Sequence, residues 1–123
     1  MAAPSRLLIH PIRDVTIVNF QDASILDTAQ IEQIGETLYD LVDNRSHRKI
    51  ILDFAKVQFL SSSALGVLIT LRKKSEAIKG TVVICSLKKD LRKVFKITRL
   101  DKLFEFYDDE AKALERFGIS TAG

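Results

Sequence analysis

The residues of this chain that could do chemistry are few and scattered, with the exception of one cluster of serines. His10 and His47 are the only imidazoles among the 123 residues, and Cys85 is the only thiol. Their positions have none of the spacings that are typical of metal sites. The five glycines match neither a phosphate-binding loop nor a dinucleotide-binding fingerprint. We therefore expect a protein that is not an enzyme and that holds no metal ion or other cofactor.

Three consecutive serines, Ser61, Ser62 and Ser63, stand between a buried-strand pattern and a helical pattern. At the start of a helix the first backbone N–H groups are unpaired and the helix dipole is positive, so that an anion is favoured there. One interpretation is that one serine caps the helix and the others are solvated. The other is that one hydroxyl accepts a phosphoryl group, which adds almost two negative charges to a surface that a partner contacts. The residues by themselves leave both interpretations open.

The strands that must position these serines follow from short apolar segments. Residues 7–12 and 15–20 are rich in β-branched side chains and indicate a hairpin, whose first strand contains a proline and therefore belongs at a sheet edge. Residues 49–54 and 81–85 are apolar on both faces, which predicts buried strands, and we place 49–54 in the middle of the sheet. A further short strand is expected at 103–107.

Apolar residues at helical spacing predict four helices. Asp27 is expected to cap the first helix, in a capping-box-like pair with Gln30, and the second begins at the serines and ends before Gly80. Asp108 is expected to cap the last helix, which Gly118 closes. The apolar positions are Ile31, Ile34, Leu38, Leu41 and Val42; Ala64, Leu65, Leu68 and Leu71; Leu87, Leu91, Val94 and Phe95; and Ala111, Leu114 and Phe117.

The resulting order, ββαβαβα(β)α, indicates an α/β fold with a mixed sheet of four or five strands and about four helices. The chain is 46% hydrophobic and 28% charged and contains no repeat or linker, so we expect one domain over 1–123 with an ordered core of about 6–117 and short loose ends. A single cysteine excludes an intrachain disulfide. Without a signal peptide or a long apolar stretch, the chain is expected to be a cytoplasmic protein that does not insert into a membrane.

Several segments of the chain together resemble one known family. They are 50–54 (IILDF), 57–68 (VQFLSSSALGVL), 25–27 (ILD), 80–85 (GTVVIC) and 94–104 (VFKITRLDKLF). In this order and spacing they look like the signature of STAS domains, the family of bacterial anti-sigma factor antagonists. The resemblance covers nearly the whole chain and implies a single STAS-like domain.

In that family the motif is Asp-Ser-Ser/Thr-Gly-Leu-Gly, and a partner anti-sigma factor phosphorylates its first serine with ATP. The resemblance implies that Ser62 is the phosphoacceptor, with Ser63 and Ser61 as less favoured candidates. Two positions depart from the motif: Ser61 stands where the family has aspartate, and Ala64 stands where it has glycine. The implied partner-binding residues are Asp27, Leu60, Ser61, Ser62, Ser63, Leu65 and Gly66.

The resemblance implies a function by binding. The predicted protein is an anti-sigma factor antagonist that regulates transcription and is switched by phosphorylation of Ser62. Its partner would be an anti-sigma factor, a serine kinase of the histidine-kinase-like ATP-binding fold. The alternative is a phosphorylation-independent STAS scaffold, or an accessory subunit of a signalling complex or of a membrane transport system. A small enzyme, the third class, would need a polar pocket of which the sequence gives no sign.

The stretch from Arg72 to Lys102 carries eleven basic and three acidic residues, in a chain of formal net charge +3. Such an asymmetry favours an acidic protein partner, although a solvated basic face is the plainer interpretation. Nucleic acid is a competing partner, but no nucleic-acid-binding motif accompanies the stretch, and Phe95 belongs to the apolar stripe of the predicted helix. We therefore expect no direct contact with nucleic acid.

Overall fold

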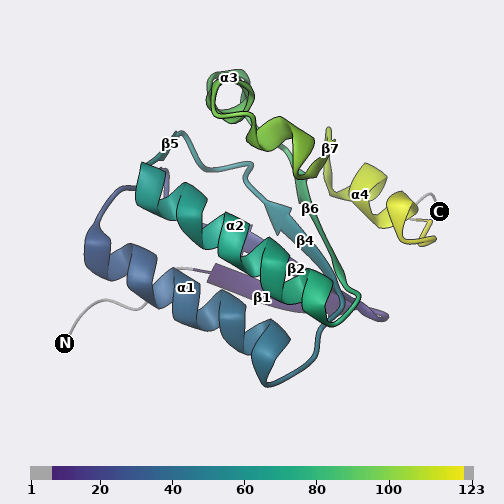
Figure 1. The fold of residues 1–123 in the computed structure, drawn as a ribbon. Helices are drawn as coiled ribbons and strands as arrows, with labels where there is room; N and C mark the ends of the chain where they lie inside the picture. The colour runs from purple at the N-terminus through teal and green to yellow at the C-terminus, as the bar shows by residue number, and fades with distance from the viewer. Residues whose placement is uncertain (1–6, 121–123) are drawn as a thin grey trace.

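The structure is a computed structural model that describes residues 7–120 (Figure 1). Its elements, in chain order, are β1 (Leu7–Ile12), β2 (Val15–Phe20), β3 (Ser24–Ile25), α1 (Thr28–Asp43), β4 (Lys49–Asp53), β5 (Phe59–Leu60), α2 (Ser62–Ala77), β6 (Thr81–Cys85), α3 (Lys89–Ile97), the 3-10 turn η1 (Leu100–Lys102), β7 (Glu105–Tyr107) and α4 (Glu110–Arg116). The predicted loose ends fall largely on residues 1–6 and 121–123, which lie outside the described residues. Within the described residues, no helix is long and apolar enough to cross a membrane.

Five strands form the main sheet, in the order β1-β2-β4-β6-β7. β1 pairs with β2 antiparallel, and the other neighbours pair in parallel, so the predicted mixed sheet is confirmed. β4 lies in the middle of the sheet and β1 at one edge, as expected from their apolar residues and from Pro11. The expected strand at 103–107 is present as the shorter β7, which forms the other edge.

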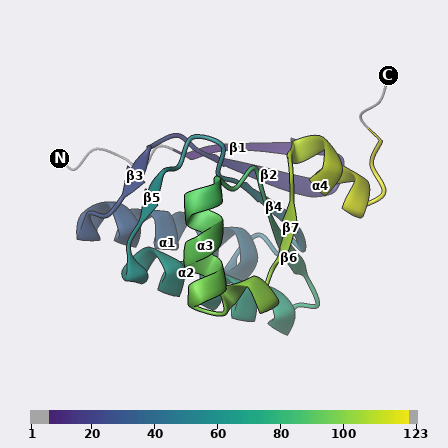
Figure 2. The ribbon, with the colours of Figure 1, turned by 90° about the horizontal axis from the view of Figure 1, so that it is seen from above.

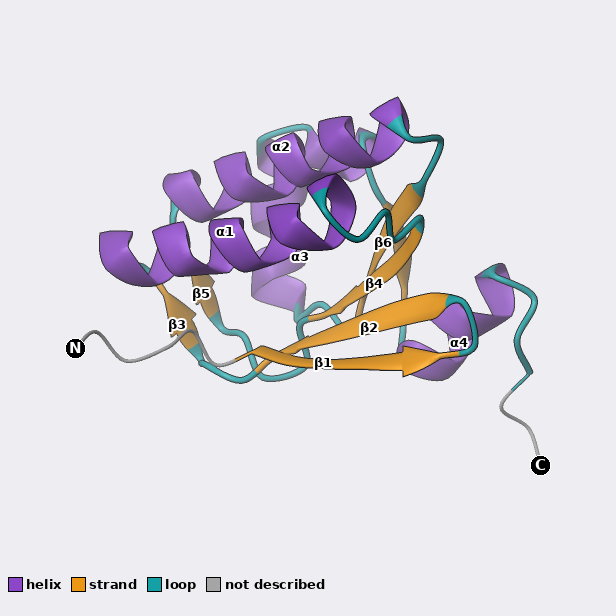
Figure 3. Cartoon of the chain, turned by 90° about the horizontal axis from the view of Figure 1, so that it is seen from below, coloured by secondary structure: helices purple, strands orange, loops and turns teal. Residues whose placement is uncertain are grey.

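Helices cover both faces of this sheet, and this explains why its central strands are apolar throughout. Ile50 and Leu52 of β4 point into a core shared with α1, α2 and α3, whereas Ile51 between them points into a second core with Ala113 and Leu114 of α4. Figure 3 shows α1, α2 and α3 on one side of the sheet, away from α4. The predicted α/β class and the four helices are thus confirmed.

Three details differ from the sequence-based expectation. β4 ends at Asp53 because Phe54 turns into the core, where it is fully buried and packs edge-to-face on Phe20 with ring centroids 4.6 Å apart. Asp109, rather than Asp108, caps α4, since the carboxylate of Asp109 accepts a hydrogen bond from the backbone N–H of Lys112 at 2.9 Å. The 3-10 turn and the strands β3 and β5 are too short to leave a sequence pattern.

The end of α2 is also built differently. Lys79, not Gly80, adopts the left-handed conformation after the helix, with φ of 60°. Gly80 is needed for a close approach: a Cβ atom there would lie 2.6 Å from Ser75 Oγ and 2.8 Å from the carbonyl oxygen of Arg48. Gly118, by contrast, has a φ of 80° and closes α4 as expected.

Candidate partner-binding site at the start of helix α2

The two-residue strands β3 and β5 bring the starts of α1 and α2 together. They pair in parallel, with Ile25 opposite Leu60, and the backbone N–H of Ser61 donates to the carbonyl of Ile25 at 3.1 Å. Figure 2 shows this pair beside the two helices, which run in the same direction in Figure 1. Asp27 and Ser62, each two residues beyond its strand, therefore lie at the same end of the molecule.

The three serines have different environments. Ser61 has extended backbone angles and is the N-cap of α2; its hydroxyl accepts a hydrogen bond from the backbone N–H of Ala64 at 3.2 Å. Ser62 and Ser63 are the first two helical residues, and both are exposed. Aspartate is also a good N-cap, so Ser61 can make the hydrogen bond that the aspartate of the resembled motif would make at this position.

Ser62 and Ser63 face different surroundings. Ser63 lines a groove of about 460 Å³ between α1 and α2, together with Glu32 and Glu36 of α1. Ser62 does not line this groove. It lies one helical turn from Gly66, which is exposed and has no other group within 4 Å of where a Cβ atom would stand. Ser62 and Gly66 thus belong to an open surface.

Exposed apolar side chains occur beside the serines. Leu26, which follows β3, is 55% exposed, and Phe59 of β5 is 56% exposed. Leu60 is half-buried, whereas Leu65 is only 6% exposed and packs in the core under the helix start. Leu26 was not singled out from the sequence, because only the pairing of β3 with β5 places it next to the serines. Phe59 is close to the serines in the chain, but only the structure shows that its side chain is exposed.

Asp27 is exposed and caps α1 as predicted, since its carboxylate accepts from the backbone N–H of Gln30 at 3.0 Å. Gln30 does not complete a capping box; its side chain donates instead to Asp22 and to the carbonyl of Ser24. Among residues 7–120, no hydrogen bond joins the Asp27 carboxylate to a serine hydroxyl. The hydrogen bond that the structure gives the Asp27 carboxylate is therefore the cap of α1.

The other groups that could do chemistry lie elsewhere. Asp53, at the end of β4, is buried, and its desolvation together with the neighbouring Glu110 raises its pKa to about 6. Burial raises the pKa of Cys85 to about 12. His47 is hydrogen-bonded to Thr16. In the described part of the chain, no group of three or more His, Cys, Asp or Glu residues could hold a metal ion.

Comparison with known sequences gives several matches. The sequence profile of the STAS domain matches residues 8–113. BtrV of Bordetella bronchiseptica is 28% identical over 93 residues, which are 76% of this chain and 79% of the relative. The anti-sigma F factor antagonist of Paenibacillus polymyxa is 25% identical over 94 residues, or 76% of this chain and 80% of the relative.

Two solved structures have a similar fold. An anti-sigma factor antagonist from Mycobacterium paratuberculosis superposes with a TM-score of 0.81 at 22% identity, over 97% of this chain and 100% of that one. The phosphorylated form of the Bacillus cell fate determinant SpoIIAA superposes with a TM-score of 0.71 at 21% identity, over 90% and 98% of the two chains. At these identities the superpositions show the fold alone. With the profile covering most of its length, the chain belongs to the STAS domain family.

Proposed function

We propose that this STAS domain acts in the cytoplasm as an anti-sigma factor antagonist. It regulates transcription by binding, through the start of α2, an anti-sigma factor that is also a serine kinase of the histidine-kinase-like ATP-binding fold. Two proteins of similar sequence or fold are named anti-sigma factor antagonists, which supports this partner class. The observation that carries the proposal is the exposed Ser62, in the first turn of a helix whose cap is already provided by Ser61.

In this proposal, phosphorylation of Ser62 is the switch. A phosphate in the first helical turn interacts favourably with the unpaired backbone N–H groups and the helix dipole, so the fold tolerates it. The same phosphate carries almost two negative charges, which must be desolvated if the open surface around Gly66 is covered by a partner. Exposed Leu26 and Phe59 give that partner an apolar contact next to the serine. Phosphorylation therefore releases the partner.

Ser62 is favoured over its neighbours by its surroundings. The hydroxyl of Ser61 is half-buried and already serves the N-cap. A phosphate on Ser63 would stand in the groove that Glu32 and Glu36 also line, where like charges repel. Ser62 is exposed and outside that groove, which leaves room for a kinase active site.

The test uses Ser62→Ala and Ser62→Asp, with Ser63→Ala and Ser63→Asp as matched controls. Each variant is incubated with the ATP-binding anti-sigma factor of the same organism, ATP and Mg²⁺; phosphosites are mapped by mass spectrometry, and affinity is measured by titration calorimetry. We expect Ser62→Ala to bind like wild type without being phosphorylated. We expect Ser62→Asp to bind at least about tenfold more weakly, because its carboxylate enters the interface.

Two results would count against this assignment. Loss of phosphorylation in Ser63→Ala alone would move the acceptor to Ser63. A protein that stays unphosphorylated, and whose Ser62→Asp variant binds like wild type, would instead favour the phosphorylation-independent scaffold or accessory subunit.

A further inference from the structure

A row of basic residues lies on the outer face of α3. Leu91 and Phe95, on its opposite face, are buried in the core. The basic residues are Lys89, Arg92, Lys93 and Lys96, and all four are exposed. At 1.5 Å of rise per residue, the row from Lys89 to Lys96 is about 10 Å long. Among residues 7–120, none of the four makes an ion pair within 4 Å, so their charges are available to another molecule.

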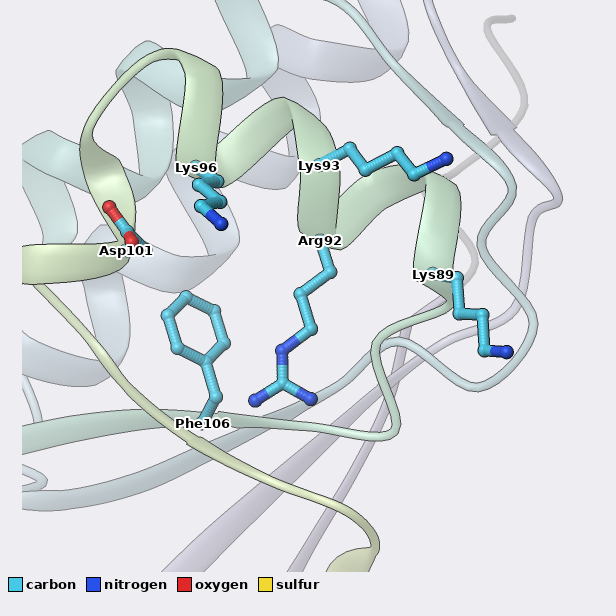
Figure 4. Close-up of a pocket in the computed structure, with 6 residues that line it drawn as sticks. All are labelled: Lys89, Arg92, Lys93, Lys96, Asp101 and Phe106. Carbon is cyan, nitrogen blue, oxygen red and sulfur yellow. The ribbon is translucent and has the colours of Figure 1, made fainter.

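These side chains border a groove of about 570 Å³ between α3 and β7, which Phe106 and Asp101 also line. Figure 4 shows Arg92 and Lys96 extending from α3 toward the strand that carries Phe106, with Asp101 at the Lys96 end. The Arg92 guanidinium lies over the Phe106 ring, 5.8 Å from its centroid. This cation–π contact places the guanidinium at the groove, and a planar guanidinium can bind a carboxylate through two parallel hydrogen bonds.

We propose that the α3–β7 groove binds an acidic polypeptide segment of a partner protein. One carboxylate pairs with Arg92, and further carboxylates lie along the lysines of α3. Ile97, at the end of α3, is 81% exposed and offers a contact for an apolar side chain of the same segment. The negative charge of Asp101 places the acidic part of the segment toward the Lys89 end of the groove.

The same features favour a polypeptide over a nucleic acid. Bases bind to basic grooves by stacking on free aromatic faces, but the Phe106 ring has the Arg92 guanidinium over it and packs edge-to-face with Phe95. α3 has nine residues and is about 13 Å long, which is short for a surface that binds successive backbone phosphates of a nucleic acid. Asp101 also places a negative charge at one end of the groove.

The groove is separate from the serine site. In Figures 1 and 2, α3 stands between β5, which leads to the serines, and β7, which borders the groove. The two surfaces therefore lie on opposite sides of α3. Binding at the groove does not rest on the function proposed for Ser62, and it is expected to be the same in Ser62→Asp as in wild type.

The experiment is a nuclear magnetic resonance titration of the isotopically labelled full chain with a short peptide of alternating glutamate and leucine. We expect amide shifts to be concentrated in α3 and β7, and to be absent with the matched glutamine peptide. The double variant Lys89→Glu with Lys93→Glu should weaken binding at least about tenfold. The double variant Lys73→Glu with Lys112→Glu has the same net charge, and it should bind within about threefold of wild type.

A finer test uses Arg92→Lys, which keeps the positive charge but loses the planar fork. We expect a several-fold weaker affinity, together with smaller shifts at Phe106. Three results would overturn the proposal: no shifts at α3 and β7 at millimolar peptide, equal weakening by both double variants, or tighter binding of hexathymidylate than of the peptide at the same amides.

Discussion

At the scale of single residues, the serine cluster divides two tasks between neighbours. Ser61 closes the helix by accepting the hydrogen bond from the N–H of Ala64, while Ser62 has no such structural duty and is exposed. If Ser62 is modified as proposed, the hydroxyl that changes is not the one that caps the helix. The departure from the family motif at Ser61 thus keeps the cap, because a serine hydroxyl accepts the same hydrogen bond that an aspartate would.

This division can be measured through stability. We expect Ser61→Ala to lower the free energy of unfolding by about 1 kcal/mol, because it removes the cap of α2. Ser62→Ala should change it by less than about 0.5 kcal/mol, as is usual for exposed positions. Urea unfolding of the two variants and wild type makes the comparison. Equal losses in both variants would mean that Ser62 also has a structural role.

Cys85 gives a second prediction at this scale. Its thiol is fully buried, and burial raises its pKa to about 12. At about pH 8, only roughly one thiol in ten thousand is then the reactive thiolate. We expect no labelling of the folded protein by a thiol reagent on the timescale in which the guanidinium-unfolded protein reacts completely. Rapid labelling of folded protein would show that β6 opens readily.

At the scale of elements, α2 depends on two glycines for different reasons. Gly66 lies in the helix, with nothing near the position of a Cβ atom, so its lack of a side chain only weakens the helix. Gly80 lies after the helix, where the chain passes close to Ser75 and to the backbone of Arg48. The first glycine leaves an open surface beside Ser62, and the second permits the turn from α2 into β6.

Alanine substitution separates the two roles. We expect Gly66→Ala to raise the free energy of unfolding by about 0.5–1 kcal/mol through helix propensity. Gly80→Ala should lower it by about 1–3 kcal/mol, since the added methyl group overlaps a backbone oxygen that cannot move freely. Thermal unfolding of the pair provides the measurement, and effects of the same sign in both variants would contradict this account.

At the scale of the whole molecule, α4 is attached to the face of the sheet opposite the other three helices, partly through polar groups. Asn19 of β2 donates to the carboxylate of Glu110 at 2.7 Å, and Glu110 contributes to raising the pKa of the buried Asp53. Asp53 also accepts from the backbone N–H of Ala55 at 2.8 Å. The Asn19–Glu110 hydrogen bond, together with Asp53 beside Glu110, joins α4 to the ends of β2 and β4, next to the second core.

The attachment makes stability depend on pH. Because the pKa of Asp53 is about 6 in the folded protein and 3.8 in the unfolded chain, the folded state keeps a proton that the unfolded state releases between these values. Stability is therefore lost as the pH rises through this window, by on the order of 3 kcal/mol. In Asp53→Asn, the side-chain oxygen still accepts the hydrogen bond from the backbone N–H of Ala55. The side-chain NH₂ group donates to Glu110, as the protonated carboxyl group of Asp53 does.

We expect Asp53→Asn to be more stable than wild type at about pH 8, with a difference that shrinks toward about pH 4. Urea unfolding across this range tests the prediction, with the exposed Asp101→Asn as a control that removes one carboxylate elsewhere. A constant difference between Asp53→Asn and wild type at all pH values would disprove the role of this carboxyl group.

The sequence predicted the main elements because their signals are local. Short length and β-branched, apolar residues distinguish the strands at 15–20 and 81–85 from the helices, and the apolar segment at 49–54 predicts a strand that is covered on both faces. The motif segments also predicted the family, which is confirmed. Element ends were less predictable: the choice of Asp109 over Asp108 as a cap, or of Lys79 over Gly80 as the left-handed residue, depends on where the neighbouring chain lies.

By itself, then, the sequence determined the α/β class, the four helices, the helix-start position of the serines and the excess of basic residues, all of which follow from periodicity, capping chemistry and charge. Only the tertiary structure decided which serine caps the helix and which is exposed, that Leu26 lies beside them, and that Phe59 is exposed. The same holds for the cation–π contact between Arg92 and Phe106. These arrangements join segments distant in the chain, through two-residue strands and packed rings whose partners are set by the fold.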